Sequence, residues 1–140
     1  MTRFDALIVD KGSSLCAKVN TGVMYTREQC ERTLKRHRVM ETICEGIGLD
    51  RMTRNFERAL PYIDQAVFIS DKEVVDMARH LLDKDGLFLG SSSALNVAAA
   101  VKVAKEVGPG HVIVTMLCSS GEREATKLYN ETFCKDRDLL

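Results

Sequence analysis

Short apolar runs alternate with longer amphipathic segments along the chain. Several of the short runs are rich in β-branched and large apolar residues, which favours strands whose side chains are mostly buried. We therefore predict strands that begin near Ala6, Thr42, Ala66 and His111, together with a shorter buried strand or extended piece over residues 87–89.

Two clear helix signals lie in the second half of the chain. Ser70 and Glu73 have the spacing of a capping box, in which each side chain accepts a hydrogen bond from the other residue's amide. An apolar stripe follows at helical spacing, so a helix is predicted over residues 71–83. A second helix, rich in alanine and valine, is predicted over residues 94–107.

The first half of the chain is less regular. Charged helices are predicted over residues 27–38 and 51–60, and the second of these is expected to end at Pro61. A Gly12-Ser13-Ser14 bend follows the first predicted strand, with no helix assigned to it.

The alternation of strands and helices predicts an α/β fold with three layers and a mostly parallel sheet. The run over residues 112–117 is apolar on both faces, which is typical of a central parallel strand. No internal repeat, low-complexity tract or linker interrupts the sequence, so residues 1–140 are expected to form one domain, a partial one because strands near its start lack partners.

Charge and cysteine content narrow the class of protein. Twenty Lys+Arg balance twenty Asp+Glu, which disfavours nucleic acids and anionic membrane surfaces as partners. No apolar window is long enough for a membrane span, and no secretory segment opens the chain. The five cysteines have neither CxxC nor zinc-site spacing, so we expect no metal site and a reduced, intracellular protein.

The best candidate for a binding site is the loop Gly90-Ser91-Ser92-Ser93. Small residues between a strand and a helix allow a ligand to approach the backbone, and a helix N-terminus offers unpaired amides. The alternative is that one serine only caps the helix. A third hypothesis is a nucleotide-binding domain that uses this loop for an anion.

Two further loops follow predicted strands. They have the sequences CSSGER, over residues 118–123, and EGIG, over residues 45–48. Ligands of open α/β sheets bind at the carboxyl ends of strands. Together with the loop over residues 90–93, these two loops are therefore predicted to surround a ligand-binding site. Cys118 is either a low-pKa thiol or a buried structural cysteine. Glu122 and Arg123 form either an ion pair that positions the loop or part of a catalytic site.

The order of these motifs resembles a known enzyme family. EGIG, SDKE, DGLFLGSSSA and VIVTMLCSSGER follow one another as in the C-terminal part of cysteine synthases and cystathionine β-synthases, and most resemble the fungal cysteine synthase 2 branch. The resemblance implies a partial copy of the large domain of a fold type II pyridoxal-phosphate enzyme. It also implies pyridoxal 5′-phosphate as cofactor, an amino-acid substrate and a homodimer, located in the cytoplasm or mitochondria.

The resemblance also assigns roles to individual residues. The family segment G-I-S-S-G falls on residues 90–94, so Ser92 is implied to bind the pyridine nitrogen of the cofactor. Ser119 is implied to lie beside the cofactor ring, and Gly46, Ile47 and Gly48 to form the loop at the active-site mouth. A neutral hydroxyl on the ring nitrogen makes the cofactor a weaker electron sink, which suits β-replacement on an O-activated serine by sulfide to give cysteine.

The sequence departs from the family in two ways. Cys118 stands where many relatives carry proline, and Ala94 replaces a glycine. More importantly, the cofactor-bearing lysine, the loop that grips the substrate carboxylate and the loop that holds the phosphate have no counterpart here. We therefore assign no catalytic residue and expect no catalysis by this chain alone. The alternative is a non-catalytic remnant or interaction domain that docks on an intact homologue.

Overall fold

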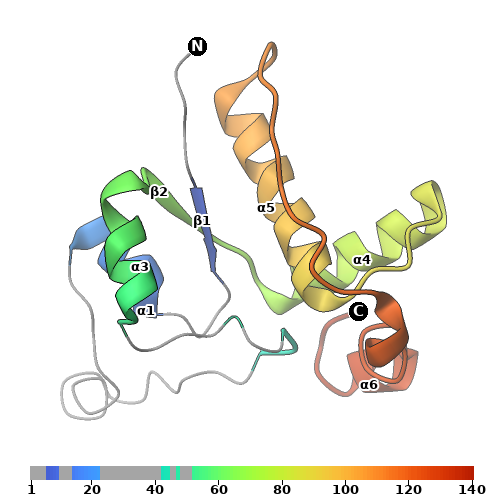
Figure 1. The fold of residues 1–140 in the computed structure, drawn as a ribbon. Coiled ribbons are helices and arrows are strands. Elements are labelled where there is room, and N and C mark those ends of the chain that lie inside the picture. Colours follow the sequence, from blue (N-terminus) through green and yellow to red (C-terminus); the bar gives the residue numbers. More distant parts are fainter. Residues whose placement is uncertain (1–5, 10–13, 23–41, 45–46, 48–51) are drawn as a thin grey trace. The chain divides into compact units, whose positions relative to one another are not determined.

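The computed structural model describes residues 6–9, 14–22, 42–44, 47 and 52–140 (Figure 1). The chain divides into two compact units. The first unit comprises residues 1–42 and 46–68, and the second comprises residues 43–45 and 69–140.

The first unit is built on a pair of parallel strands. Strand β1 (Ala6–Val9) pairs with β2 (Gln65–Phe68) in the register Ala6 to Gln65 and Val9 to Phe68. Helix α1 (Ser14–Thr21) contacts β2 through a small core centred on Leu15 and Ala66, which are 3% and 4% exposed. The structure thus has strands at two of the four predicted positions, near Ala6 and Ala66, and these two strands are parallel.

Helix α1 also completes the hydrogen bonding of β2. The side-chain amide of Asn20 donates to the Ala66 carbonyl at 3.0 Å and accepts from the Ala66 amide at 2.9 Å. The thiol of Cys16 lies against the same carbonyl, and burial raises the pKa of this thiol. An asparagine side chain therefore satisfies both backbone groups that a further strand would otherwise pair with at this position.

Helix α3 (Arg54–Ala59) precedes β2 in the chain. Its cap is Thr53, whose hydroxyl accepts a hydrogen bond from the Phe56 amide at 3.2 Å. A short 3₁₀ helix with Pro61 in its first turn follows directly (Leu60–Tyr62). The helix predicted over residues 51–60 is confirmed in its central part, whereas the helix predicted over 27–38 lies outside the described residues.

The second unit contains the two long helices. Helix α4 (Asp71–Asp85) and helix α5 (Ser91–Val107) pack against each other (Figure 1). The contact is apolar because each helix buries one face. The buried residues are Val74, Val75, Ala78 and Leu81 on α4 and Ala94, Leu95, Ala98, Ala99 and Val103 on α5. Both predicted helices are confirmed, although α5 begins at Ser91 rather than at Ala94.

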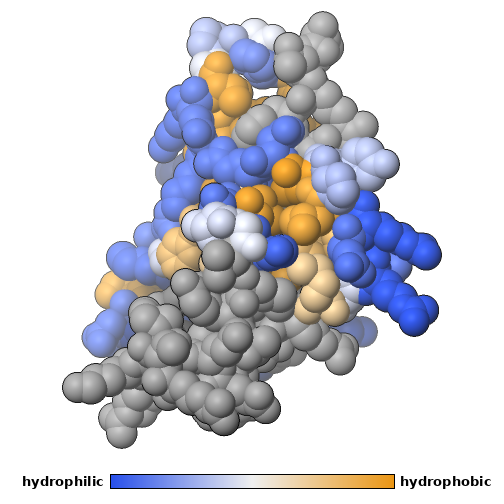
Figure 2. Space-filling model, turned by 90° about the vertical axis from the view of Figure 1, so that its left-hand side faces the viewer, coloured by the Kyte–Doolittle hydropathy of each residue, from blue (hydrophilic) through white to orange (hydrophobic). Residues whose placement is uncertain are grey.

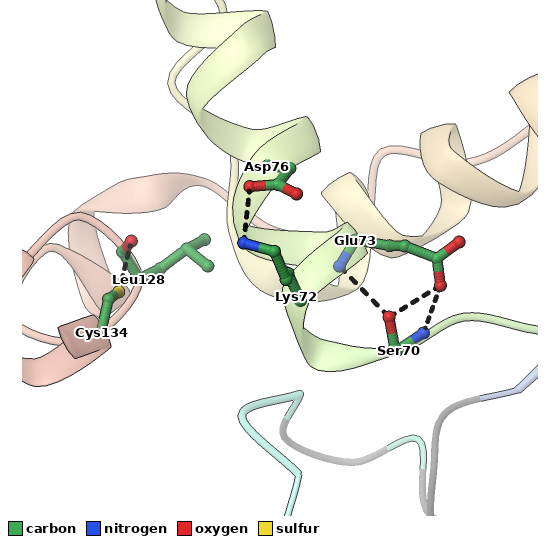
Figure 3. A network of polar contacts seen from close by, with 6 residues as sticks. All are labelled: Ser70, Lys72, Glu73, Asp76, Leu128 and Cys134. Atoms are coloured by element: carbon green, nitrogen blue, oxygen red, sulfur yellow. Dashed lines mark hydrogen bonds and ion pairs between the residues drawn. The ribbon is translucent and has the colours of Figure 1, made fainter. Parts of the chain in front are cut away.

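The start of α4 has the predicted capping box (Figure 3). The Ser70 hydroxyl accepts from the Glu73 amide at 3.3 Å, and the Glu73 carboxylate accepts from the Ser70 amide at 2.8 Å. Lys102 of α5 contacts the same carboxylate at 2.7 Å. Burial alone would raise the pKa of Glu73, but the hydrogen bonds from Lys102 and Ser70 outweigh it and hold that pKa below its usual value. Gly86 ends the helix in the left-handed conformation, with φ of 67°.

The chain after α5 ends in a small cluster of short helices. A 3₁₀ helix (Gly121–Glu124) precedes α6 (Glu131–Lys135), which is capped by the Asn130 side chain. The thiol of Cys134 is fully buried and donates to the Leu128 carbonyl at 3.5 Å (Figure 3). Leu128 and Leu139 are buried in the same region of sequence, at 1% and 8% exposed.

Two predicted strands are wrong, and a third segment, predicted as a strand or an extended piece, forms only a single bridge. Residues 42–44 and 111–117 have no strand conformation, and residues 87–89 contribute only an isolated antiparallel bridge between Leu89 and Ser120. Leu87 and Phe88 are also exposed rather than buried. A strand requires a hydrogen-bonding neighbour, and within the described residues β1 and β2 are the only strands that pair. The apolar pattern of a segment shows that its side chains are suited to burial in a sheet, but it does not show whether a neighbouring strand is there to pair with it.

Helix α1 was not predicted. It begins at Ser14, inside the bend that the Gly12-Ser13-Ser14 sequence suggests. Its sequence has a weak apolar stripe, so local periodicity gives little signal. The helix is instead stabilised by contacts made far along the chain, through Leu15 and Asn20 to Ala66.

Apolar side chains are not confined to the interior. Figure 2 shows hydrophobic side chains grouped between strongly hydrophilic ones on one face of the molecule. Large exposed apolar residues are concentrated over residues 112–117, where Val114 is 86% exposed. None of the helices among the described residues has the length and hydropathy needed to cross a membrane.

Candidate functional site

The two serine loops meet in the second unit. Ser92 lies in the first turn of α5, and Ser119 belongs to the part of the chain that follows this helix and runs back along it in Figure 1. Their hydroxyl oxygens are 2.8 Å apart, and both residues are half-buried. The structure therefore brings together the two residues to which the family resemblance assigns contacts with the cofactor ring.

Ser93 fixes the position of Ser119. Its hydroxyl accepts a hydrogen bond from the Ser119 amide and donates one to the Ser119 carbonyl, each at 2.8 Å. The Gly90 amide donates to the same carbonyl at 3.0 Å, and the Gly121 amide donates to the Phe88 carbonyl at 3.1 Å. Because Ser93 is fully buried, its hydrogen bonds to Ser119 are shielded from water, and they fix the positions of the two loops relative to each other.

Gly90 is required by close approach rather than by its backbone conformation. Its φ of −78° is open to any residue. A Cβ atom at this position, however, would lie 2.3 Å from the Ser119 hydroxyl oxygen and 2.8 Å from a carboxylate oxygen of Glu124. The absence of a side chain therefore allows the second loop to lie directly on the start of α5.

The N-terminus of α5 is already occupied by an anionic side chain. The carboxylate of Glu124 accepts a hydrogen bond from the Ser91 amide at 3.0 Å. This contact satisfies one free helical amide and places a negative charge at the positive end of the helix. Because the Ser91 amide already binds the Glu124 carboxylate, it is not available to an external anion. The contact therefore argues against the hypothesis that the loop binds a nucleotide phosphate.

No serine side chain caps α5. The cap is Gly90, and it makes no side-chain capping bond. The structure thus disagrees with the interpretation that a serine of this loop only caps the helix. Glu124 takes that role from a position 33 residues away from Ser91, a separation at which no local sequence signal exists.

Tyr129 supports the loop before α5. Its hydroxyl donates to the Leu89 carbonyl at 2.5 Å, and its ring packs against Phe88 with the ring centres 4.7 Å apart. Burial raises the pKa of Tyr129, which keeps the hydroxyl protonated and able to donate. Sequence reasoning missed this residue because nothing near it in the sequence marks a contact with Leu89.

Asn96 holds the returning segment against α5. Its side-chain amide donates to the Met116 carbonyl at 2.8 Å and to the Cys118 sulfur at 3.3 Å. Cys118 is exposed, so the interpretation of this residue as a buried structural cysteine is wrong.

The remaining predicted residues contribute less. Glu122 and Arg123 are exposed, and no ion pair joins them in the part of the chain that the structure describes. The loop is positioned by Glu124 instead. Ile47 lies in a turn and is half-buried, whereas Gly46 and Gly48 lie outside the described residues.

Ser91 differs from its neighbour Ser93. Both side chains are almost completely buried, with exposed fractions of 1% and 0%. The Ser93 hydroxyl makes two hydrogen bonds, whereas the Ser91 hydroxyl has no partner among the described residues. Ser91 is therefore a buried polar group whose loss of hydration no hydrogen bond among the described residues offsets.

Comparison with known proteins places the chain in a family. The sequence pattern of the family described as pyridoxal-phosphate dependent enzyme matches residues 13–119. Cysteine synthase 2 of Schizosaccharomyces pombe is 51% identical over 129 residues, covering 92% of this chain and 32% of that protein. Cysteine synthase 2 of Emericella nidulans is 48% identical over 119 residues, covering 85% of this chain and 28% of that protein.

The fold has a counterpart among solved structures. The O-acetylserine-dependent cystathionine β-synthase of Helicobacter pylori superposes with a TM-score of 0.65 at 26% sequence identity. The match covers 87% of this chain and 33% of that chain, so the chain spans about a third of the length of the relatives it matches. The chain belongs to the family of pyridoxal-phosphate-dependent enzymes, in the group of the cysteine synthases and cystathionine β-synthases.

Proposed function

We propose that this chain supplies the ring-nitrogen side of the pyridoxal phosphate site of a cysteine synthase. The observation that carries the proposal is the contact between Ser92 and Ser119, whose hydroxyl oxygens are 2.8 Å apart at the start of α5. The reaction is β-replacement on an O-activated serine by sulfide, which gives cysteine. Family membership and the names of the relatives support this activity.

The two hydroxyls fit the pyridine end of the cofactor. Each serine hydroxyl has one proton to donate, and the contact between Ser92 and Ser119 uses only one of the two. When Ser119 donates to Ser92, the Ser92 proton is free for an external acceptor such as a ring nitrogen. The half-buried position of Ser92 leaves part of its surface open to a ligand.

The type of donor suits this reaction. A hydroxyl is neutral and does not hold a bound ring nitrogen in its protonated form as a carboxylate would. The cofactor, when bound, withdraws electrons from the substrate, and it does so less strongly with an unprotonated nitrogen. Ser92 thereby favours β-replacement over reactions that need a stronger electron sink.

The phosphate end of the cofactor needs residues from elsewhere. The Ser91 amide at the start of α5 already binds the Glu124 carboxylate, and a second negative group beside it would be repelled. The family's lysine, substrate-carboxylate and phosphate motifs also have no counterpart in the sequence. One hydrogen bond from Ser92 contributes about 1 kcal/mol, far below what micromolar binding requires. The chain by itself is therefore expected to be inactive.

A non-catalytic role remains the second candidate. In it the chain is an interaction domain that docks on an intact homologue, and the exposed apolar residues 112–117 favour it. Under either function we propose an intracellular protein, in keeping with the free thiols of Cys16, Cys118 and Cys134. We also propose that the complete fold is the three-layer α/β domain and that the complete enzyme is a homodimer.

The test is a chimera in which this chain replaces the matching 129 residues of the Schizosaccharomyces pombe relative. The chimera is expected to show the visible absorbance of bound pyridoxal phosphate and to form cysteine. Ser92→Ala should weaken cofactor binding about fivefold, the effect of about 1 kcal/mol. Ser120→Ala is the matched control because the Ser120 side chain is exposed and makes only a 3.4 Å contact to Glu122.

Two results would overturn the proposal. One is saturable cofactor binding by the 140-residue chain alone, which would show that it needs no residues from elsewhere. The other is an active chimera whose cofactor affinity and activity are the same with Ser92 and with alanine.

A further inference from the structure

The short connection between α4 and α5 leads into the helical turn that carries Ser92. Two of its residues, Phe88 and Gly90, are fixed by backbone hydrogen bonds to the chain that follows α5. The residue between them, Leu89, is fixed by a side chain instead, because its carbonyl accepts a hydrogen bond from the Tyr129 hydroxyl at 2.5 Å. A backbone hydrogen bond forms with almost any side chain, whereas this one requires a donor at position 129.

The ring of Tyr129 is itself held in place. It packs against the ring of Phe88, with the ring centres 4.7 Å apart and the planes inclined by 52°. The preceding residue, Leu128, is 1% exposed, and its carbonyl accepts from the thiol of Cys134 at 3.5 Å (Figure 3). A tyrosine side chain has only two main torsions, so a ring fixed in this way directs its hydroxyl to one point.

Tyr129 and Ser119 bind the two sides of one peptide unit. The Leu89 carbonyl and the Gly90 amide belong to the same planar group. Its oxygen accepts from the Tyr129 hydroxyl, and its N–H donates to the Ser119 carbonyl at 3.0 Å. Gly90 is the cap of α5, and its own carbonyl accepts from the Ala94 amide at 3.0 Å. The orientation of this peptide unit therefore sets the direction in which α5 begins.

The same peptide unit connects Tyr129 to the serine pair. Ser119 accepts from it through the backbone and contacts Ser92 through the side chain, with the hydroxyl oxygens 2.8 Å apart. Without the Tyr129 hydroxyl, the unit would be held on its N–H side only and could rotate about that hydrogen bond. Such a rotation would move the first turn of α5, and Ser92 with it, relative to Ser119.

We propose that Tyr129 is a positioning residue for Ser92, because it fixes the Leu89–Gly90 peptide unit and thereby the place of the Ser92 hydroxyl beside the pyridine nitrogen of the cofactor. The inference rests on the proposed function, which gives Ser92 its role. Tyr129 does not touch the cofactor in this proposal. It acts through the backbone at the start of α5.

The family match does not assign this role. Tyr129 lies beyond residues 13–119, which match the sequence pattern of the family. The competing explanation is that Tyr129 only stabilises the fold. A stabilising residue would act on cofactor binding independently of Ser92, whereas a positioning residue loses its effect once the Ser92 hydroxyl is gone. A double-mutant cycle distinguishes the two explanations.

The experiment uses the chimera with the Schizosaccharomyces pombe relative in four forms, namely unmodified, Tyr129→Phe, Ser92→Ala and the double variant. The dissociation constant of pyridoxal phosphate is measured from its visible absorbance. Tyr129→Phe should weaken binding about threefold to fivefold, because a residue that acts through Ser92 cannot cost more than the loss of the Ser92 hydroxyl. Added to Ser92→Ala, the same substitution should change the affinity less than about 1.5-fold.

Cys134→Ala is the matched control for stability. It removes a buried thiol that supports the segment carrying Tyr129, but this thiol has no contact with Leu89. The control should lower the unfolding temperature at least as much as Tyr129→Phe and leave the cofactor affinity within about 1.5-fold of the unmodified chimera. Tyr129→Phe keeps the ring that packs against Phe88, so its circular dichroism should match that of the unmodified chimera.

Three results would overturn the inference alone. They are an unchanged affinity in Tyr129→Phe, effects of Tyr129→Phe and Ser92→Ala that multiply independently, and an equal loss of affinity in Cys134→Ala. In each case a weaker affinity in Ser92→Ala would leave the proposed function standing. An unchanged affinity in Ser92→Ala would instead overturn the proposed function, and this inference with it.

Discussion

The hydroxyl oxygens of Ser92 and Ser119 lie 2.8 Å apart, although 27 positions separate the two residues in the sequence. Ser93 fixes this contact, because its hydroxyl hydrogen-bonds both the backbone amide and the backbone carbonyl of Ser119. A pair of neutral donors is thus fixed at the start of α5 by a buried side chain that is not itself available to a ligand. The position of Ser119 beside Ser92 therefore depends on Ser93.

Ser93→Ala is expected to destabilise the chain by about 2–3 kcal/mol. The substitution removes both hydrogen bonds to Ser119 and leaves its amide and carbonyl without that partner. Urea unfolding followed by circular dichroism measures the loss. Ser120→Ala removes only an exposed capping bond, in which the Ser120 hydroxyl accepts from the Glu122 amide at 3.4 Å, and should cost about 0.5–1 kcal/mol. Equal effects of the two substitutions would show that Ser93 does not join the loops.

Unlike Ser93→Ala, the substitution Ser91→Ala is not expected to lower the free energy of unfolding. The Ser91 hydroxyl is buried without a partner among the described residues, so its removal abolishes a desolvation cost and no hydrogen bond. The free energy of unfolding should stay the same or rise by up to about 1 kcal/mol. The same urea titration compares it directly with Ser93→Ala. A loss above about 1 kcal/mol would reveal a partner for this hydroxyl.

Glu124 gives a third test, of the charge at the start of α5. Glu124→Gln keeps an oxygen that can accept from the Ser91 amide but removes the negative charge, so a loss of about 0.5–1 kcal/mol is expected. Glu124→Ala removes the acceptor as well and should cost about 1–3 kcal/mol. Thermal unfolding at low and high salt separates the two effects, because salt screens the charge contribution of the wild-type protein. No difference between glutamine and glutamate would contradict the helix-charge explanation.

The fourth prediction concerns pH and Glu73. Its pKa is lowered in the folded protein, so the unfolded chain binds more protons as the pH falls below the ordinary value of 4.5. The stabilisation by the Lys102 contact is therefore complete above that pH and is lost as the pH falls through the folded pKa. Because both side chains are about 40% exposed, it amounts to about 0.5 kcal/mol.

The measurement for Glu73 is the unfolding midpoint of the wild type and of Glu73→Gln between pH 3 and about 7. The wild type should be the more stable at neutral pH, and the difference should vanish at the acidic end. Asp76→Gln serves as a control because the Lys72–Asp76 pair is 3.8 Å apart and exposed. A difference that persists unchanged at the acidic end would rule out the ionic origin.

Local signals in the sequence were sufficient for the two long helices. Ser70 and Glu73 mark the start of α4, and Gly86 marks its end, because capping contacts join residues within a few positions of each other. The serine loops were also recognisable from the sequence, since small residues at the start of a helix are a local feature. The family assignment followed from the order of these motifs.

Tertiary structure alone decided how the loops meet and which strands form. The Glu124 contact with Ser91 and the Tyr129 contact with Leu89 join residues 33 and 40 positions apart, and no local pattern encodes them. The run over residues 112–117 has the composition of a strand but has no strand beside it among the described residues. The sequence therefore determined what each segment is suited to do, whereas strand formation and the shape of the site depend on the neighbours that folding brings to it.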